Sequence, residues 1–176
     1  MSILQTVQES IGQPEITQIS QKLGVDPQTA QKAVAAAVPM IVGGMAGHAS
    51  QSPDGARDVQ EVMHQHASAI EDVPQVVQTA PPTGGSFLSR IFGSHQETVQ
   101  QGVQQASGLS FDKVKHLLSM ISPLVLSTLA RHRSIPNATD PSNSQQVTKV
   151  LQHEAQQAQY EAPHVGGLLD QMLKAF

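Results

Sequence analysis

The chain has 176 residues, of which 39% are hydrophobic and 14% charged; its formal net charge is −4, and it contains no cysteine. This length suits one domain or two small ones, and the apolar content is enough for a packed core. The lack of cysteine excludes disulfides, thiol chemistry and cysteine-ligated zinc. The net negative charge gives no overall electrostatic case for binding nucleic acid.

Charged and polar residues are distributed unevenly. Residues 1–83 carry three Lys/Arg against eight Asp/Glu, a balance of −5, whereas residues 84–176 carry seven against six, a balance of +1. Tryptophan is absent, so we expect an aliphatic core. Abundant glutamine gives neutral polar faces, which either only keep the protein soluble or favour self-association. The N-terminal MSILQTVQES has neither a basic region nor a long apolar run, so we expect no signal peptide and a cytoplasmic location.

An internal repeat organises the chain at an offset of 84 residues. The stretch KLGVDPQTAQKAVAAAVPMIVGGMAGHA lies over ASGLSFDKVKHLLSMISPLVLSTLARHR, so that Gly24 meets Gly108 and Pro39 meets Pro123. The apolar positions between them agree as well. The C-terminal GGLLDQMLKAF resembles GGSFLSRIF at the start of the second unit. We therefore predict a duplicated unit followed by the first helix of a third.

Each unit is predicted to contain four helices. In the first unit a short helix covers residues 3–11 and a second covers 15–23. A third, apolar helix begins at Asp26-Pro27, and a fourth covers 56–72. Gly24 suits the C-cap of the second helix, because glycine adopts the left-handed conformation freely. Asp26 suits an N-cap, followed by proline at the first helical position.

The second unit repeats this order with Ser110 in place of the capping aspartate. Its predicted helices include residues 87–92 and 144–160. No β pattern competes, so the predicted fold class is all-α: two tandem four-helix units with a C-terminal capping helix. The predicted organisation is as follows: first repeat 1–72, linker 73–85, second repeat 86–160, and linker plus capping helix 161–176, with a further loop at 134–143.

Pro39 and Pro123 each fall about a dozen residues into the apolar helix. Proline inside a helix costs about 3 kcal/mol, so its presence at the same point twice predicts a deliberate kink or break. The uncharged run at 33–47 is roughly 20 Å long, shorter than the ~30 Å hydrocarbon core of a membrane. We therefore expect a buried core helix, in which Gly43-Gly44 lets a neighbour approach closely, rather than a membrane segment.

The glycine turns also resemble the layout of a helix-turn-helix. The second unit offers a modest set of basic residues as nucleic-acid contacts: Lys113, Lys115, His116, Arg131 and Arg133. The first unit offers only Gln28, Gln31 and Lys32 beside Asp26. The simpler interpretation of both turns is a packing corner within a helical bundle.

The histidines do not form a recognisable metal or catalytic motif. His48 and His132 close the apolar helix in both units, where a histidine interacts favourably with the helix dipole. A metal site built from His48 with His64 or His66 is the alternative, although the last two point to different faces of one helix. No HExxH, GxSxG or phosphate-binding loop is present, so we predict no catalytic, cofactor-binding or metal residues.

The stretches LGVDPQTAQKAVAAAVPMIVGGMA, GGSFLSRIFGSHQETVQQGVQQASGLSFDKVKHLLSMISPLVLSTLA and GGLLDQML resemble a bacterial family called domain of unknown function 937, which is related to the YidB-like proteins. The resemblance covers nearly the whole chain. It implies an all-α bacterial protein with homeodomain-like helical units, and it brings no activity, substrate or site residues. Members often continue with a Gly/Asp-rich stretch beyond GGLLDQML, so we expect this chain to be shortened there.

The sequence thus supports three functional hypotheses. The first is a non-enzymatic interaction or scaffold module that binds an unidentified protein or a second copy of itself. The second is a weak or architectural DNA-binding protein that uses the basic residues of the second unit. The third is a membrane-associated or metal-binding role. No cofactor is implied by any of them.

Overall fold

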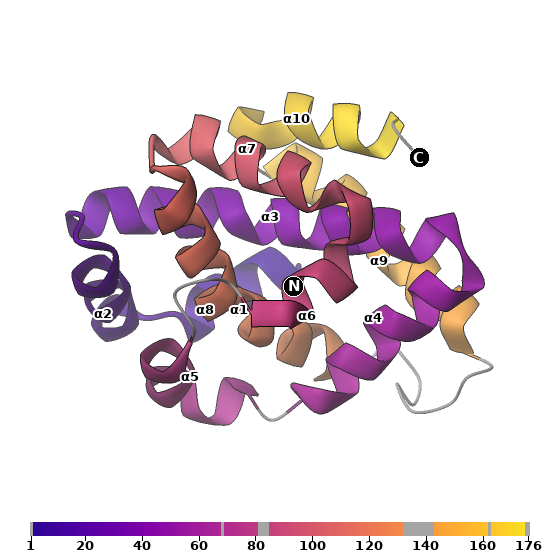
Figure 1. Cartoon of the computed structure of the whole chain (residues 1–176), viewed down its shortest axis with the longest axis horizontal. Helices are drawn as coiled ribbons and strands as arrows, with labels where there is room; N and C mark the ends of the chain where they lie inside the picture. Colours follow the sequence, from indigo (N-terminus) through magenta and orange to yellow (C-terminus); the bar gives the residue numbers. More distant parts are fainter. Residues whose placement is uncertain (1, 68, 81–84, 132–142, 162, 175–176) are drawn as a thin grey trace.

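The computed structural model describes residues 2–67, 69–80, 85–131, 143–161 and 163–174, and within these ranges it contains helices and no strand (Figure 1). This confirms the all-α prediction. The α-helices are α1 (Ile3–Ser10), α2 (Gln13–Leu23), α3 (Pro27–Gln51), α4 (Pro53–Gln65), α5 (Val73–Thr79), α6 (Gly85–Phe92), α7 (Gln96–Ser107), α8 (Phe111–Arg131), α9 (Ser144–Glu161) and α10 (Pro163–Lys174). Two short 3₁₀ helices, η1 (Ala69–Asp72) and η2 (Gly93–His95), precede α5 and α7.

Both predicted glycine turns are present. Gly24 ends α2 with φ of 61° and Gly108 ends α7 with φ of 72°, the left-handed region that glycine adopts at little cost. The Asp26 carboxylate accepts a hydrogen bond from the Thr29 backbone N–H at 2.9 Å and so caps α3, with Pro27 at its first position. These local signals were enough to predict where α2 ends and α3 begins.

The two apolar helices are continuous, contrary to the predicted break at each proline. α3 runs through Pro39 and α8 runs through Pro123 without interruption. Each proline removes one backbone hydrogen bond at a cost of about 3 kcal/mol. Both prolines and nearly all their helical neighbours are buried, and we attribute the persistence of both helices to the larger stabilisation from that burial.

α3 is the central element of the core. Among the described residues it alone is long and apolar enough to cross a membrane, and 83% of its most apolar 18-residue window is buried inside the fold. The helix is longer than the uncharged run at 33–47, because polar residues extend it at both ends. Burial on this scale is what a central core helix of a globular domain requires.

Helices from the two halves of the sequence interlock around α3 and α8, which pack against each other. α3 packs more extensively against α7 and α9 of the second half than against α2 and α4 of its own. In return, α8 contacts α1, α2 and α4 of the first half. The core is therefore shared between the two halves of the sequence.

Gly44 allows one of these close approaches. A Cβ atom on Gly44 would lie 2.8 Å from Cδ1 of Phe92 and 2.8 Å from Cγ2 of Val99. Phe92 is fully buried at the end of α6, and Val99 is fully buried in α7. The prediction that a neighbouring segment approaches the Gly43-Gly44 pair closely is confirmed at Gly44.

The predicted fourth helix of the first unit and the linker after it are both corrected. α4 ends at Gln65, so the predicted 56–72 helix is split by a turn before η1. Part of the predicted linker is α5, which begins because the Asp72 side chain accepts a hydrogen bond from the Gln75 N–H at 3.1 Å. Val73 and Val77 of α5 are buried. Residues 81–84 and most of the predicted 134–143 loop lie outside the described residues.

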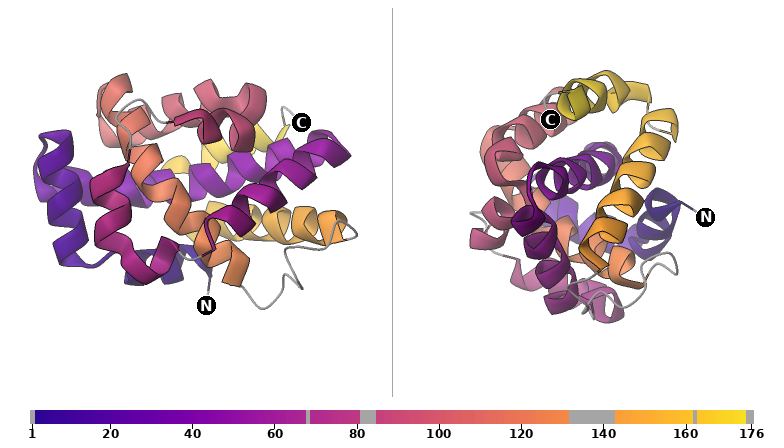
Figure 2. Two further views of the ribbon diagram at one scale, coloured as in Figure 1. Left: turned by 60° about the horizontal axis from the view of Figure 1, so that its bottom comes forward. Right: turned by 90° about the vertical axis from the view of Figure 1, so that its right-hand side faces the viewer.

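α10 begins at Pro163, inside the stretch predicted as a linker, and packs against α3, α7 and α9. The end-on view of Figure 2 shows α9 and α10 together on one side of α3. On the other half, η1 packs on α8, and α5 packs on both α8 and α2. The sequences entering α5 and α10, DVPQV and EAPHV, also agree in their acid, proline and valine. α10 and α5 thus pack in comparable ways on helices of both halves, whereas the duplication, and α10 as the start of a third unit, stay predictions.

Candidate functional site

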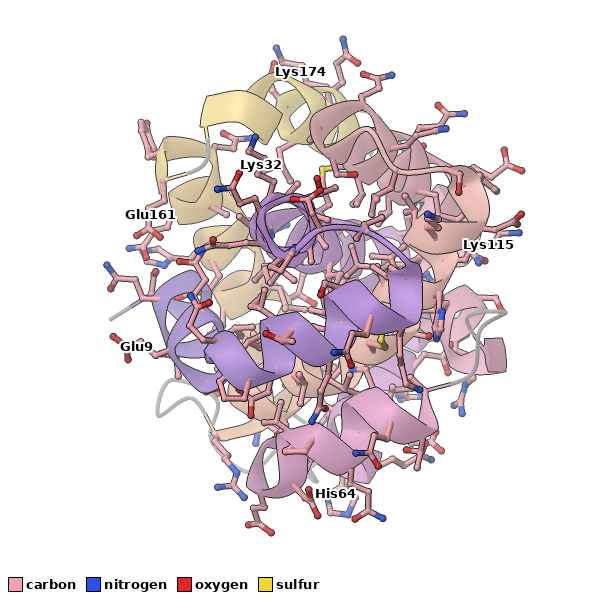
Figure 3. The ribbon with its side chains drawn as sticks, turned by 90° about the vertical axis from the view of Figure 1, so that its left-hand side faces the viewer. Glu9, Lys32, His64, Lys115, Glu161 and Lys174 are labelled. Carbon is pink, nitrogen blue, oxygen red and sulfur yellow. The ribbon has the colours of Figure 1, made fainter. Side chains whose placement is uncertain are left out.

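Four of the five predicted nucleic-acid contacts belong to the described residues, and these four do not lie on one surface. Lys113 and His116 are one turn apart on α8 and share a face, whereas Lys115 lies on nearly the opposite side of the helix. The ammonium group of Lys115 stands 4.9 Å from the centroid of the Phe111 ring. Lys115 projects outward at the rim of the end view in Figure 3, away from the centre of the molecule.

Arg131 is at the other end of α8, eighteen residues or about 27 Å from Lys113. Its Nε donates a hydrogen bond to the Ala67 carbonyl at 3.2 Å, and its guanidinium forms an ion pair with Glu71. Arg131 therefore ties α8 to the segment that leads into α5. Arg133 lies outside the described residues.

A third basic residue, Lys22, lies near Lys113 and His116. Sequence analysis did not predict its part in this group. Lys113 Nζ donates to the Gly24 carbonyl at 3.3 Å, and Lys22 Nζ donates to the Gln78 carbonyl. Burial and the charge of Lys22 both lower the pKa of His116, and a hydrogen bond with the Ala80 backbone opposes them. The ends of α2 and α5 and the start of α8 thus bring three basic side chains together, which we call the basic corner (Lys22, Lys113 and His116).

The two helix-turn-helix-like pairs differ in what their second helix exposes. α8 packs against α2 and α5, so its N-terminal half faces other helices of the chain. The first turns of α3 expose Gln28, Gln31 and Lys32 instead, and Lys32 is visible on that helix in Figure 3. The copy with more basic residues is therefore the one with the less accessible helix.

A second polar cluster lies at the C-terminal end of α3, where α4, α6 and η2 meet it. His48 Nε2 lies 3.8 Å from Asp58 Oδ2, and the imidazole is 16% exposed. Both ring nitrogens are enclosed and neither has a hydrogen-bond partner among the described residues. A Cβ atom on Gly93 would stand 2.6 Å from His48 Nδ1, so the tight turn at Gly93 covers the ring.

Arg90 forms ion pairs with both carboxylates of this cluster and offsets part of their charge. Its guanidinium lies 3.2 Å from Glu61 and 3.6 Å from Asp58. His95 contacts the Gln51 side chain, and burial together with the neighbouring His48 lowers the pKa of His95. The predicted dipole role of His48 is thus accompanied by contacts to α4 and η2 that its sequence position did not indicate.

The predicted metal alternative is not assembled in the described part of the chain. There, no group of three or more His, Asp or Glu side chains is arranged to hold a metal ion. His64 is exposed, and burial lowers the pKa of His66. His132, the counterpart of His48 in the repeat, lies outside the described residues.

A family model described as bacterial protein of unknown function (DUF937) matches residues 5–132. The chain belongs to this family. The match spans α1 to α8 and includes both glycine turns and both buried prolines, which confirms the resemblance noted in the sequence. The comparisons with curated proteins and with solved structures found no match.

Membership of DUF937 carries no activity, so the chemistry must be argued from the side chains. Asp58 and Glu61 both face Arg90, which opposes their use as an acid/base pair. Ser52, close to His48 in the chain, accepts a hydrogen bond from the Gly55 N–H at 3.0 Å and caps α4. The described contacts of these side chains join two helices or cap one.

Proposed function

We propose that this DUF937 chain is a non-enzymatic helical module that associates with a second copy of itself through the outward face of α9. The supporting observation is Tyr160, a large hydrophobic side chain among the described residues whose exposed fraction is 88%. Tyrosine is enriched in the cores of protein interfaces, where charged residues are depleted. An exposed tyrosine at the end of a long, weakly charged helix face fits such a contact.

The rest of that face has suitable chemistry for binding its own copy. Lys149, His153, Gln156 and Tyr160 recur at helical spacing, all are exposed, and one of the four carries a full charge at neutral pH. Exposed Gln146 and Gln157 flank them. A glutamine amide both donates and accepts hydrogen bonds, so a glutamine-rich face is complementary to itself, as a two-fold symmetric contact requires.

The opposite face of α9 holds it firmly in the fold. Leu151, Ala155 and Ala158 are buried there. At the edge of the outward face, the exposed Gln152 also ties α9 to α3, since its Nε2 donates to Ser50 Oγ at 3.0 Å. α9 is about 27 Å long, so one helix face buries less area than a standard interface. The proposal is therefore weak, reversible association rather than an obligate dimer.

The mass of the protein in solution tests this proposal. Sedimentation velocity of the full chain over a concentration series should show a rise toward twice the mass of one chain. Gln146→Glu/Gln156→Glu should suppress that rise, because it places like charges opposite each other across a two-fold contact. Gln101→Glu/Gln105→Glu on the exposed face of α7 adds the same charge elsewhere and should leave association intact. A wild type that stays monomeric at the highest concentration would contradict the proposal.

The two alternatives from the sequence receive less support from the contacts. DNA binding through α8 is less favoured because Arg131 is already paired with Glu71. The other described basic residues of this set are divided between two faces of α8. A membrane role would require α3 to leave the core that it fills. The cytoplasmic location expected from the sequence stays a proposal.

A further inference from the structure

We infer that the basic corner, formed by Lys22, Lys113 and His116 where α2 and α5 end and α8 begins, is a binding site for a diphosphate or a comparable pair of phosphate groups. This inference is independent of the proposed self-association, which uses a different helix. It rests on the position, charge and hydrogen bonding of side chains from two distant parts of the chain.

The three side chains converge because helix ends converge. Lys113 reaches the Gly24 carbonyl at the end of α2, and Lys22 reaches the Gln78 carbonyl in the last turn of α5. His116 lies one turn beyond Lys113 on the same face of α8 and is close enough to Lys22 for that charge to affect its titration. Each ammonium group has three N–H donors, so a contact to one carbonyl leaves donors for a ligand.

No ion pair between described residues cancels the positive charge at this corner. Among the described residues, the ion pairs use Arg57, Arg90, Arg131 and Lys174, together with two histidines, and neither Lys22 nor Lys113. Helix-end carbonyls carry only about half a charge in total at each end. Of the nearby carboxylates, Asp26 accepts hydrogen bonds from the backbone and side chain of Thr29, and Asp112 is exposed. A dianionic ligand would meet two lysines whose charges are not used by an ion pair between described residues.

One ring nitrogen of His116 has no partner in the described fold, because the hydrogen bond with the Ala80 backbone uses the other nitrogen. The unpartnered atom, Nε2, is enclosed and makes no hydrogen bond, which is a cost for a polar atom away from water. In the neutral ring this nitrogen is an acceptor, and it carries a proton only in the imidazolium form. A phosphate group held by Lys22 and Lys113 would stabilise the protonated imidazole through its negative charge. Ligand binding and protonation of His116 are thereby coupled.

The dimensions favour a short phosphate chain over a long DNA duplex. Lysine binds phosphate as a point charge and needs no planar geometry. Arg131, the next basic residue that was predicted to touch nucleic acid, is about 27 Å away along α8 and is paired with Glu71. The phosphates could come from a free small molecule or from two neighbouring nucleotides of a nucleic-acid strand.

Histidine NMR spectra of the full chain test this inference. Sodium pyrophosphate is added at constant ionic strength while the ring resonance of His116, assigned by its loss in His116→Gln, is followed. We expect a saturating shift and an increase in the pKa of His116. Lys22→Gln and Lys113→Gln should each weaken binding about tenfold, as for loss of one hydrogen bond to a charged group. Lys115→Gln removes the same charge from the far side of α8 and should leave binding unchanged.

The possible results distinguish the two sources of phosphate from each other, and both from the absence of a phosphate site. A mixed-sequence DNA duplex that produces the same lysine-dependent shift identifies a nucleic-acid backbone as ligand, whereas a response to pyrophosphate alone identifies a small molecule. The inference is overturned if His116 does not respond up to about 10 mM pyrophosphate, well above a millimolar Kd. It is equally overturned if Lys115→Gln weakens binding as much as Lys113→Gln, because the attraction would then be diffuse.

Discussion

Gly44 of α3 and Phe92 of α6 are packed so closely that the space for a Cβ atom on the glycine is already occupied by the aromatic ring, at 2.8 Å from Cδ1. The contact joins the central helix of the first half to the start of the second half. It explains why a residue with poor helix propensity sits in the middle of a buried helix. Two glycines inside helices, one with a crowded Cβ position and one with an open Cβ position, allow this explanation to be tested.

Gly44→Ala should lower the free energy of unfolding by about 1 kcal/mol. Alanine gains up to about 1 kcal/mol of helix propensity, but overpacking against the buried Phe92 and Val99 side chains costs about 1–3 kcal/mol. Gly167, in α10, has no atom within 4 Å of a Cβ position, so Gly167→Ala should raise stability by about 0.5–1 kcal/mol. Urea denaturation measures both. Stabilisation by Gly44→Ala would show that the neighbouring segments move apart freely.

Stability should fall as the pH is lowered from about 7.5 to about 5.5. Burial lowers the pKa of His66, His95 and His116 below the ordinary value of 6.5, assisted by His48 at His95 and by Lys22 at His116. The unfolded chain therefore binds more protons than the folded one in this window, so the free energy of unfolding decreases as the pH falls. Asp26, whose pKa is lowered chiefly by its hydrogen bonds with Thr29, acts only at more acidic pH.

Thermal unfolding at a series of pH values measures this effect. The variant His66→Gln/His95→Gln/His116→Gln should have a flatter dependence of stability on pH than the wild type. Replacing the exposed His64 and His153 by glutamine removes histidines that face solvent and should retain the wild-type slope. Equal slopes for all three proteins would assign the pH dependence to other groups.

Much of the fold was predictable because its signals are local. Gly24 and Asp26 fix the end of α2 and the start of α3 through their own backbone and side chain, without help from distant residues. Asp72 and Pro74 give the same kind of signal for α5, but the proline-rich stretch after them suggested a linker. The buried prolines misled in the opposite direction, because the packing that maintains α3 through Pro39 lies in other parts of the chain.

The candidate sites depend on tertiary contacts and were less predictable. Lys22 and His116 are 94 positions apart, and only the packing of α2 and α5 on α8 brings them together. Arg131 looked available for phosphate until the segment carrying Glu71 was placed beside it. A list of basic residues gives the available charges, whereas the neighbours of each side chain decide which charges remain for a ligand.

Arg90→Gln should lower the free energy of unfolding by up to about 1 kcal/mol, because the pairs with Glu61 and Asp58 are partly exposed. The loss should be smaller in 1 M NaCl, where the Debye length is about 3 Å and the ion pairs are screened. Arg57→Gln removes an equal charge from a more exposed pair, 3.8 Å from Asp54, and should change stability less. An effect of Arg90→Gln that is large and independent of salt would indicate lost packing of the arginine stem instead.

Leu169→Ala should lower the free energy of unfolding by about 2–4 kcal/mol if α10 completes the second half of the fold. The Leu169 side chain is fully buried, as is Val77 in α5, which packs on helices of both halves as α10 does. A loosely attached start of a third repeat would instead tolerate the change, because its unfolding would not disturb α3. Urea denaturation followed by circular dichroism measures the loss, and Lys174→Ala, at an exposed position of the same helix, is the control. A single cooperative transition with a reduced midpoint would show that α10 unfolds with the core, whereas an unchanged midpoint would separate α10 from it.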